Sequence, residues 1–162
     1  MDARRCLIPG YTIPNLAYTR CHRDVMTQMQ GQANKVVVAF LDGRRAKGYV
    51  FNFSALRDTF RLFPEQTSHH EAGTDIPLKD LKAIFFVKDF IGHPEYHESY
   101  DIVSSAHGRR VEVKCADGET IVAVTEGYNP QKPGFFVFPP DPNSNNLRIF
   151  VVTKNARSVR ML

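Results

Sequence analysis

From residue 35 onward, short runs of apolar and often β-branched residues are separated by turn-forming residues, which predicts β-strands rather than helices. The first such run, Val36–Leu41, ends at Asp42-Gly43. An Asp-Gly pair between apolar runs predicts a tight hairpin, because glycine accepts the positive φ of a primed turn. A second strand is expected over about 45–53, and Gly48 within it predicts a bulge or a sharp bend in the sheet.

The rest of the chain continues this pattern in a series of short strands separated by turn-forming residues. In the first half, strands are expected over about 59–63, 75–78 and 82–87, with a loop over 64–74. In the second half, strands are expected over 110–115, 119–128, 134–138, 148–153 and 157–162.

The two sets of strands align at a constant offset of 75 residues, with no gap. Lys35–Gly43 lies over Arg110–Gly118, and Phe60–Pro64 lies over Phe135–Pro139. The identical pairs fall on turn residues and on alternate apolar positions, where a fold constrains chemistry. Self-similarity at a fixed period predicts a repeat architecture. The expected organisation is an N-terminal segment over residues 1–34, a first repeat over 35–87, a linker over 88–109 and a second repeat over 110–162.

The N-terminal segment shows a different period. Apolar residues recur at steps of three and four, which places them on one face of an α-helix over about 16–30. Asn15 can cap the start of this helix, and Gly31 can end it. The residues of the apolar face are Tyr18, Cys21, Val25 and Met29.

These elements resemble the Sm-like fold, a small SH3-like barrel. The closest motif is Val36–Val50, which is similar to the first Sm motif, and residues 151–162 resemble the second. The resemblance implies a mainly β protein of two tandem five-stranded SH3-like (Sm-like) barrels with an N-terminal α-helix. Residues 35–162 are also similar to uncharacterised bacterial proteins with the same pattern, a resemblance that implies no function.

The binding pockets of related barrels are not carried over with the architecture. Sm proteins bind uridine through an Asp and an Asn after the bent strand and an Arg-Gly pair between the last strands, whereas this chain has Asn52-Phe-Ser54, Lys79-Asp80 and Lys154-Asn155. PilZ domains bind cyclic di-GMP through an Arg-x-x-x-Arg and an Asp/Asn-x-Ser-x-x-Gly motif. Asn52–Arg57 matches part of the second motif without its glycine, and no Arg-x-x-x-Arg lies at a suitable distance upstream, so cyclic di-GMP is the least favoured ligand.

Composition narrows the cellular setting. No apolar run reaches 18 residues, so no membrane span is expected. The N-terminus has no apolar core of a secretory signal, and three unpatterned cysteines are typical of reduced thiols, which together favour a cytoplasmic location. The net charge of +4 is distributed along the sequence rather than concentrated in one cluster.

The candidate catalytic and metal-binding residues favour neither an enzyme nor a metalloprotein. His93 and His97 have a zinc-ligand spacing, but no third ligand is evident apart from His69-His70. Cys115 shares a strand face with apolar residues, where a buried thiol has a raised pKa and is inert. Phosphate-binding glycine loops are missing from the sequence. We therefore expect no catalysis, no cofactor and no metal.

The most suggestive feature is an aromatic residue and a cation that recur in the loop after the second strand of each repeat. The residues expected to bind a ligand there are Asn52, Phe53, Arg57, Tyr128, Asn129 and Lys132. Phe53 and Tyr128 are expected at the surface. The leading hypothesis is a protein-interaction or adaptor module that uses these loops and the barrel edges. RNA or other nucleic acid is the alternative ligand, and open edges also allow a homo-oligomer.

Overall fold

The computed structural model describes residues 7–8, 11–12, 33–66, 73–92, 95–97, 99 and 108–162. The chain forms two compact units, residues 1–32 and residues 33–162. In the first unit the described residues form a two-stranded hairpin of β1 (Leu7–Ile8) and β2 (Tyr11–Thr12). The helix expected over residues 16–30 lies outside the described residues.

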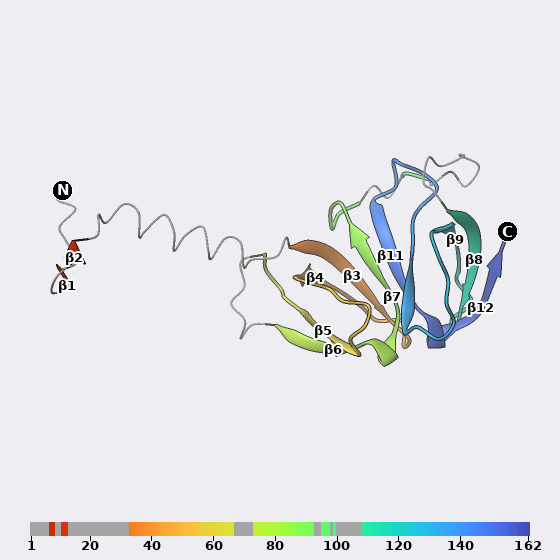
Figure 1. Ribbon diagram of the computed structural model, residues 1–162. Helices are drawn as coiled ribbons and strands as arrows, with labels where there is room; N and C mark the ends of the chain where they lie inside the picture. Colours follow the sequence, from red (N-terminus) through yellow and green to blue (C-terminus); the bar gives the residue numbers. More distant parts are fainter. Residues whose placement is uncertain are drawn as a thin grey trace. The chain divides into compact units, whose positions relative to one another are not determined.

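The second unit is mainly β, as the sequence predicts (Figure 1). The strands expected from residues 35–87 are β3 (Asn34–Phe40), β4 (Arg45–Val50), β5 (Thr59–Leu62), β6 (Thr74–Pro77) and β7 (Leu81–Val87). Those expected from residues 110–162 are β8 (Arg109–Cys115), β9 (Thr120–Thr125), β10 (Gly134–Val137), β11 (Asn146–Val152) and β12 (Ala156–Met161). Two short 3-10 helices, η2 (Leu78–Asp80) and η3 (Thr153–Asn155), precede β7 and β12.

These strands form three antiparallel sheets. Their orders are β10-β11-β7-β3-β4, β12-β8-β9 and β5-β6. Isolated bridges between Tyr49 and Phe63 and between Val124 and Phe138 connect the ends of these sheets. Followed from neighbour to neighbour, the strands form one path, β6-β5-β4-β3-β7-β11-β10-β9-β8-β12, in which β6 and β12 are the two ends.

This arrangement differs from two closed barrels. Within the described ranges, no sheet closes on itself. Instead, β11 pairs with β10 on one side and with β7 on the other. Strands from both expected barrels therefore share the five-stranded sheet, with β7 and β11 side by side at its centre (Figure 1).

Two cores lie on opposite sides of the β7–β11 pair. Alternate side chains of each strand enter different cores: Ile84 and Phe150 belong to the first, and Ala83 and Ile149 belong to the second. Apart from β7 and β11, the first core is built from buried side chains of β3 to β6, and the second from those of β8 to β10. Because both of its faces are buried, β7 has an almost continuous apolar sequence.

Both expected Asp-Gly hairpins are present, but each loop has three residues rather than two. The Phe40 N–H donates to the Arg44 carbonyl oxygen at 2.9 Å, and the Cys115 N–H donates to that of Glu119 at 2.8 Å. The glycines at positions 43 and 118 both have a φ of 89°. This is the arrangement of a turn followed by a left-handed residue, which needs glycine at its third loop position alone.

Gly48 marks a close approach of two backbones. A Cβ atom added at Gly48 would lie 2.5 Å from the carbonyl oxygen of Phe63. The neighbouring residue, Tyr49, exchanges two backbone hydrogen bonds with Phe63, at 2.8 and 2.9 Å. The glycine thus allows the end of β5 to cross over β4.

Candidate functional site

A hollow with a volume of about 590 Å³ lies between the β4–β5 loop and the β9–β10 loop. One loop contributes Ala55 and Leu56, and the other contributes Tyr128, Asn129 and Lys132; the sheet beneath contributes phenylalanines and Arg148. The corresponding loops of the two halves of the unit therefore meet at one place. The sequence indicated each loop separately but did not predict that they share a cavity.

The β9–β10 loop is held by hydrogen bonds within the loop. The Asn129 Oδ1 atom accepts from the Gln131 N–H at 2.9 Å, and the Asn129 carbonyl oxygen accepts from the Lys132 N–H at 3.1 Å. The Tyr128 ring packs edge-on against Phe135, with ring centroids 4.8 Å apart. This packing leaves Tyr128 half-buried and fixes one wall of the hollow, while Lys132 is exposed beside it.

The β4–β5 loop places its expected residues differently. Phe53, expected at the surface, is half-buried against the first core, and its ring lies 5.0 Å from that of Phe150. Asn52, with a φ of 53°, and Arg57 are both exposed. The hollow is lined instead by their neighbours Ala55 and Leu56, and the Leu56 side chain is 79% exposed. Leu56 is thus an apolar side chain at the rim that sequence analysis missed.

Arg148 of β11 is the second residue that sequence analysis missed. Its guanidinium carbon lies 4.5 Å from the ring centroid of Phe86 and 4.7 Å from that of Phe136. Cation–π contacts on two rings hold this charge at the floor of the hollow. Its signal in the sequence was a single cation within the apolar run of β11. Local patterning cannot relate such a cation to the β9–β10 loop, about 20 residues away.

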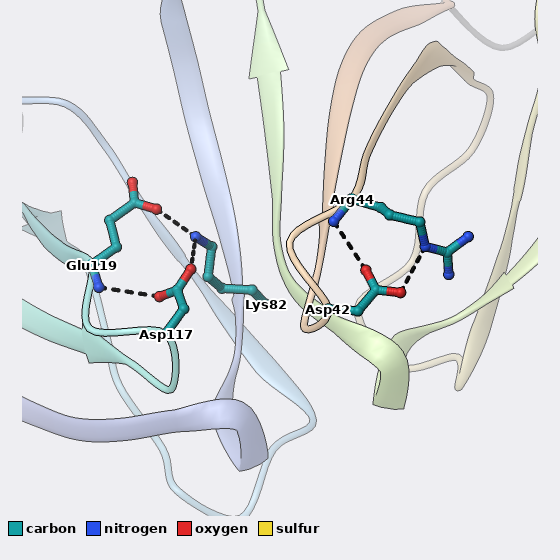
Figure 2. Close-up of polar contacts among 5 residues, drawn as sticks. All are labelled: Asp42, Arg44, Lys82, Asp117 and Glu119. Carbon is teal, nitrogen blue, oxygen red and sulfur yellow. Dashed lines mark hydrogen bonds and ion pairs between the residues drawn. The ribbon is translucent and has the colours of Figure 1, made fainter.

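A second polar cluster connects the two halves of the unit. Figure 2 shows the Lys82 side chain of β7 reaching the β8–β9 turn, where its Nζ atom lies 2.6 Å from Asp117 Oδ2 and also contacts Glu119. The Lys82 side chain is 5% exposed. Burial alone lowers the pKa of Lys82, but the hydrogen bonds to Asp117 and Glu119 outweigh it and raise this pKa overall. The Lys82 hydrogen bond in turn lowers the pKa of Asp117.

The corresponding β3–β4 turn is satisfied locally. Asp42 Oδ2 accepts from Arg44 Nε at 2.6 Å, within the same exposed loop (Figure 2). In both turns the other carboxylate oxygen accepts the N–H two residues further on, at 3.0 and 3.1 Å. Neither cluster faces the hollow, so we assign both to the stability of the turns.

Cys115 is buried, as the sequence predicts, at 1% exposure. Burial raises the pKa of its thiol to about 11. The thiolate required for nucleophilic attack is therefore scarce at neutral pH. We assign Cys115 to the second core.

Asp141, a buried residue of the β10–β11 loop, binds described residues of the connection between the two halves. Its carboxylate accepts from the Tyr96 hydroxyl at 2.5 Å and from the Ser99 N–H at 3.0 Å. These hydrogen bonds lower the pKa of Asp141, so it is ionised at neutral pH. The residues described between 95 and 99 are therefore attached to the body of the unit.

β8 and β12, two paired strands of the three-stranded sheet, carry five exposed cations. β8 and β12 carry one acidic residue, Glu112, which lies 3.9 Å from Lys114 and 3.7 Å from Arg160. We define the basic face by the five cations of these two strands, which are Arg109, Arg110, Lys114, Arg157 and Arg160. The pairing of β8 with β12 thus brings these five cations onto neighbouring strands.

Within the part of the chain that is described, no group of three or more His, Cys, Asp or Glu side chains has a metal-binding arrangement. Of the four candidate histidines, His97 is described and exposed, and the other three lie outside the described residues. No described helix has the length and apolar character needed to cross a membrane.

Comparison with known proteins identifies a family whose function is not known. Residues 32–162 match the model of a family of unknown function, DUF6982. No curated protein and no solved structure matches the chain. The resemblance to uncharacterised proteins is thereby confirmed at the level of an uncharacterised family.

Proposed function

The chain belongs to this family of unknown function, and we propose that it is a non-catalytic protein-interaction module. Its principal contact site is the hollow between the β4–β5 and β9–β10 loops. The observation that carries the proposal is the meeting of both loops at one cavity, with an exposed leucine at the rim and cations at the floor and edge. The open sheet edges at β6 and β12 supply further contact surface.

The lining of the hollow indicates the chemistry of the partner. Ala55, Leu56 and Tyr128 offer apolar surface, whose burial is the main favourable term in association. Lys132 and Arg148 place two positive charges beside that surface. A partner segment with an apolar anchor side chain and a neighbouring carboxylate fits both features, because the anchor displaces water while the carboxylate pairs with the cations.

The proposal also includes the architecture. Each half of the unit has the neighbour order expected of an open SH3-like (Sm-like) barrel: the last strand, the first, the second, the third and the fourth. The strand bounds support the 75-residue repeat, since β3 and β8 begin at Asn34 and Arg109, and β7 and β12 begin at Leu81 and Ala156. We propose that the two halves are copies of one unit, joined through β7 and β11.

The positions of the carboxylates with shifted pKa values support a non-catalytic role. The carboxylates with lowered pKa values each have a hydrogen-bonding partner in a turn, a ladder or a loop: Asp42, Asp75, Asp117 and Asp141. An enzyme positions its perturbed groups toward a substrate. Here none of these four aspartates lines the hollow, whose lining carboxylate is Glu126.

Selection from a library of random displayed peptides tests this proposal. We expect enrichment of peptides that combine an apolar anchor with Asp or Glu. A synthetic version of the enriched peptide is then titrated against the wild type, Leu56→Asp and Lys132→Glu by fluorescence anisotropy. Both substitutions should weaken binding by about 10-fold or more. Lys154→Glu, an exposed charge reversal outside the hollow, is the matched control and should bind as the wild type does.

Single-stranded RNA is the second candidate ligand, and the basic face supports it. Five cations on two adjacent strands form the kind of surface that neutralises phosphates. If RNA is the ligand, the natively purified protein should show a high ratio of absorbance at 260 nm to that at 280 nm, which nuclease or salt abolishes. Affinity for a labelled mixed-sequence RNA should then fall steeply with salt and fall further in Lys114→Glu, but not in Lys132→Glu. A peptide selected at the hollow with no RNA binding would leave the protein partner as the function.

A further inference from the structure

The two halves of the unit use the outer edges of their last strands differently. β7 pairs with β3 on one side and with β11 on the other. β12, the last strand of the second half, pairs in the same way with β8, and none of the described strands pairs with its other edge. An edge of this kind offers a row of backbone donors and acceptors to another strand.

The complementary edge lies at the other end of the path of strands. β11 pairs with β10 and with β7, whereas its counterpart β6 pairs with β5 and has no second partner among the strands that the structure describes. The unit therefore contains one complete interface, between β7 and β11. It also contains the two edges of a second such interface, at β12 and β6, which pair with no described strand. In Figure 1 these two open edges lie on opposite sides of the unit.

We propose that copies of this chain associate head to tail, with the outer edge of β12 in one copy pairing with the outer edge of β6 in the next. The internal β7–β11 pair is the template for this contact. The proposal rests on the suggested use of sheet edges as contact surfaces, and it is independent of binding at the hollow. A contact between two different surfaces repeats from copy to copy, so it produces rings or chains rather than simple dimers.

The template defines the register of the new pairing. In the internal interface, Phe86 is opposite Arg148 and Ile84 is opposite Phe150. Displaced by the 75-residue offset, these pairs place Met161 opposite Gly73 and Val159 opposite Asp75 of the next copy. Pro77 lies beyond the paired stretch, since the internal register ends at Val151 with Ala83. The proline of β6 therefore does not obstruct this pairing.

An ion pair of the internal interface also has a counterpart. Lys82 is at a bulge of β7, where the register with β3 shifts, and Arg157 is at the corresponding bulge of β12, where the register with β8 shifts. Equivalent positions at a bulge direct side chains to the same side of a strand. Lys82 pairs with Asp117 of the β8–β9 turn (Figure 2). Arg157 would by the same geometry meet Asp42 of the β3–β4 turn in the next copy.

The external interface is more polar than the internal one. Phe150 and Phe136 at the internal contact are replaced in the first half by Asp75 and Arg61, which form an exposed ion pair at 2.9 Å. The association is therefore weaker than the internal pairing and depends on charge. The β12 side contributes cations such as Arg157 and Arg160, and the opposite side contributes Asp42 and Asp75, so the attraction decreases as salt screens it.

Sedimentation velocity on the full chain tests the proposal. The sedimentation coefficient is measured from about 10 µM to about 1 mM protein, at about 50 and about 500 mM sodium chloride. We expect the weight-average mass to rise with concentration beyond a dimer at low salt, and to fall at high salt. A monomer at every concentration and both salt levels would overturn the proposal.

A charge swap identifies the surfaces involved. Arg157→Glu and Asp42→Lys should each weaken association by about 10-fold, and the double variant should regain it, because both partners of the ion pair are reversed. Arg109→Glu makes the same charge change on β8, away from the outer edge of β12, and is the matched control. Equal losses in Arg109→Glu and Arg157→Glu, or no rescue in the double variant, would contradict the proposed contact.

A backbone variant tests the strand pairing itself. The Leu162 N–H donates to the Arg110 carbonyl oxygen of β8 at 2.9 Å. By the alternation of an antiparallel ladder, the Met161 N–H points away from β8, to the outer edge. Met161→Pro removes this outward donor and leaves the β8 ladder intact, so it should abolish association while the circular dichroism spectrum is retained. Unchanged association in a folded Met161→Pro variant would rule out edge pairing. Peptide binding at the hollow in the same variant shows separately whether the proposed function holds.

Discussion

β7 and β12 are each the last strand of their half of the unit, and they differ sharply in sequence. β7 reads Leu-Lys-Ala-Ile-Phe-Phe-Val and is buried on both faces, whereas β12 reads Ala-Arg-Ser-Val-Arg-Met and is exposed at four of its six positions. The cause is the neighbour on the outer edge. β11 covers β7 and brings a second core with it, while no described strand covers β12. The polarity of a strand here reflects its neighbours rather than its place in the fold.

The two Asp-Gly turns show the same asymmetry. The β3–β4 turn is closed by its own Arg44, in solvent, whereas the β8–β9 turn accepts Lys82 from β7 (Figure 2). The backbone geometry of the two turns is nearly identical. Contacts between the halves thus stabilise one of the two last strands and one of the two turns. Substitutions at matched positions can separate the contribution of these contacts from that of the strand or turn itself.

The largest difference is expected between Phe150 and its counterpart Asp75. Phe150 is fully buried between β7, β10 and the first core, so Phe150→Ala should lower the free energy of unfolding by about 3–5 kcal/mol. Asp75→Ala removes an exposed ion pair and should leave stability within error of the wild type. Urea unfolding followed by circular dichroism measures both. Similar losses for the two variants would mean that the β7–β11 joint is not the main connection of the unit.

The next largest difference is expected between Lys82 and Arg44. Lys82→Ala leaves two carboxylates without their buried cation and should cost about 1–3 kcal/mol, at the lower end because both carboxylates are partly exposed. Arg44→Ala should have no measurable effect on stability. Lys82→Arg, which keeps the charge, is the control. A loss in Lys82→Arg equal to that in Lys82→Ala would assign the effect to packing instead of charge.

The same pair predicts a pH dependence. The folded-state pKa of Asp117 is lowered by Lys82, so its stabilising contribution is present above its ordinary value of 3.8 and is lost as the pH falls through the lowered value. The difference in stability between the wild type and Lys82→Ala should therefore be constant from neutral pH to about pH 5 and shrink below pH 4. Urea midpoints of both proteins across this range check the prediction. A difference that grows on acidification would have the wrong sign for this ion pair.

The sequence was sufficient to predict the strands and hairpins but not how they join. Local alternation shows which face of a strand is buried, and glycine at Gly43 and Gly118 shows where the chain turns. Neither signal specifies the strand that pairs with an outer edge. Burial of both faces of β7 accounts for the almost continuous apolar run of Leu81–Val87, a signal that the sequence interpretation did not use.

The candidate site shows a similar limit. The sequence identified both loops from their recurring aromatic and cationic residues, but it could not show that the loops share one hollow. Phe53 was expected outside because it lies at the loop after a strand, and its ring instead packs against Phe150, almost 100 residues away. Arg148 and Leu56 gave no local signal, since a single cation or leucine has many uses.

The smallest effect, and the most direct comparison of the two turns, is expected at their glycines. Gly43 and Gly118 share a φ of 89°, and a Cβ atom added at either would meet no atom within 4 Å. Alanine at each position therefore suffers backbone strain alone and should lower the free energy of unfolding by about 1 kcal/mol in both cases. Thermal unfolding of Gly43→Ala and Gly118→Ala measures this. Equal losses would show that Lys82 holds a turn that is already formed by its own backbone. A clearly larger loss at Gly118 would show instead that the ion pair fixes the geometry of the β8–β9 turn. That turn could not relax around the new side chain, whereas the β3–β4 turn, which has no ion pair to the other half, can.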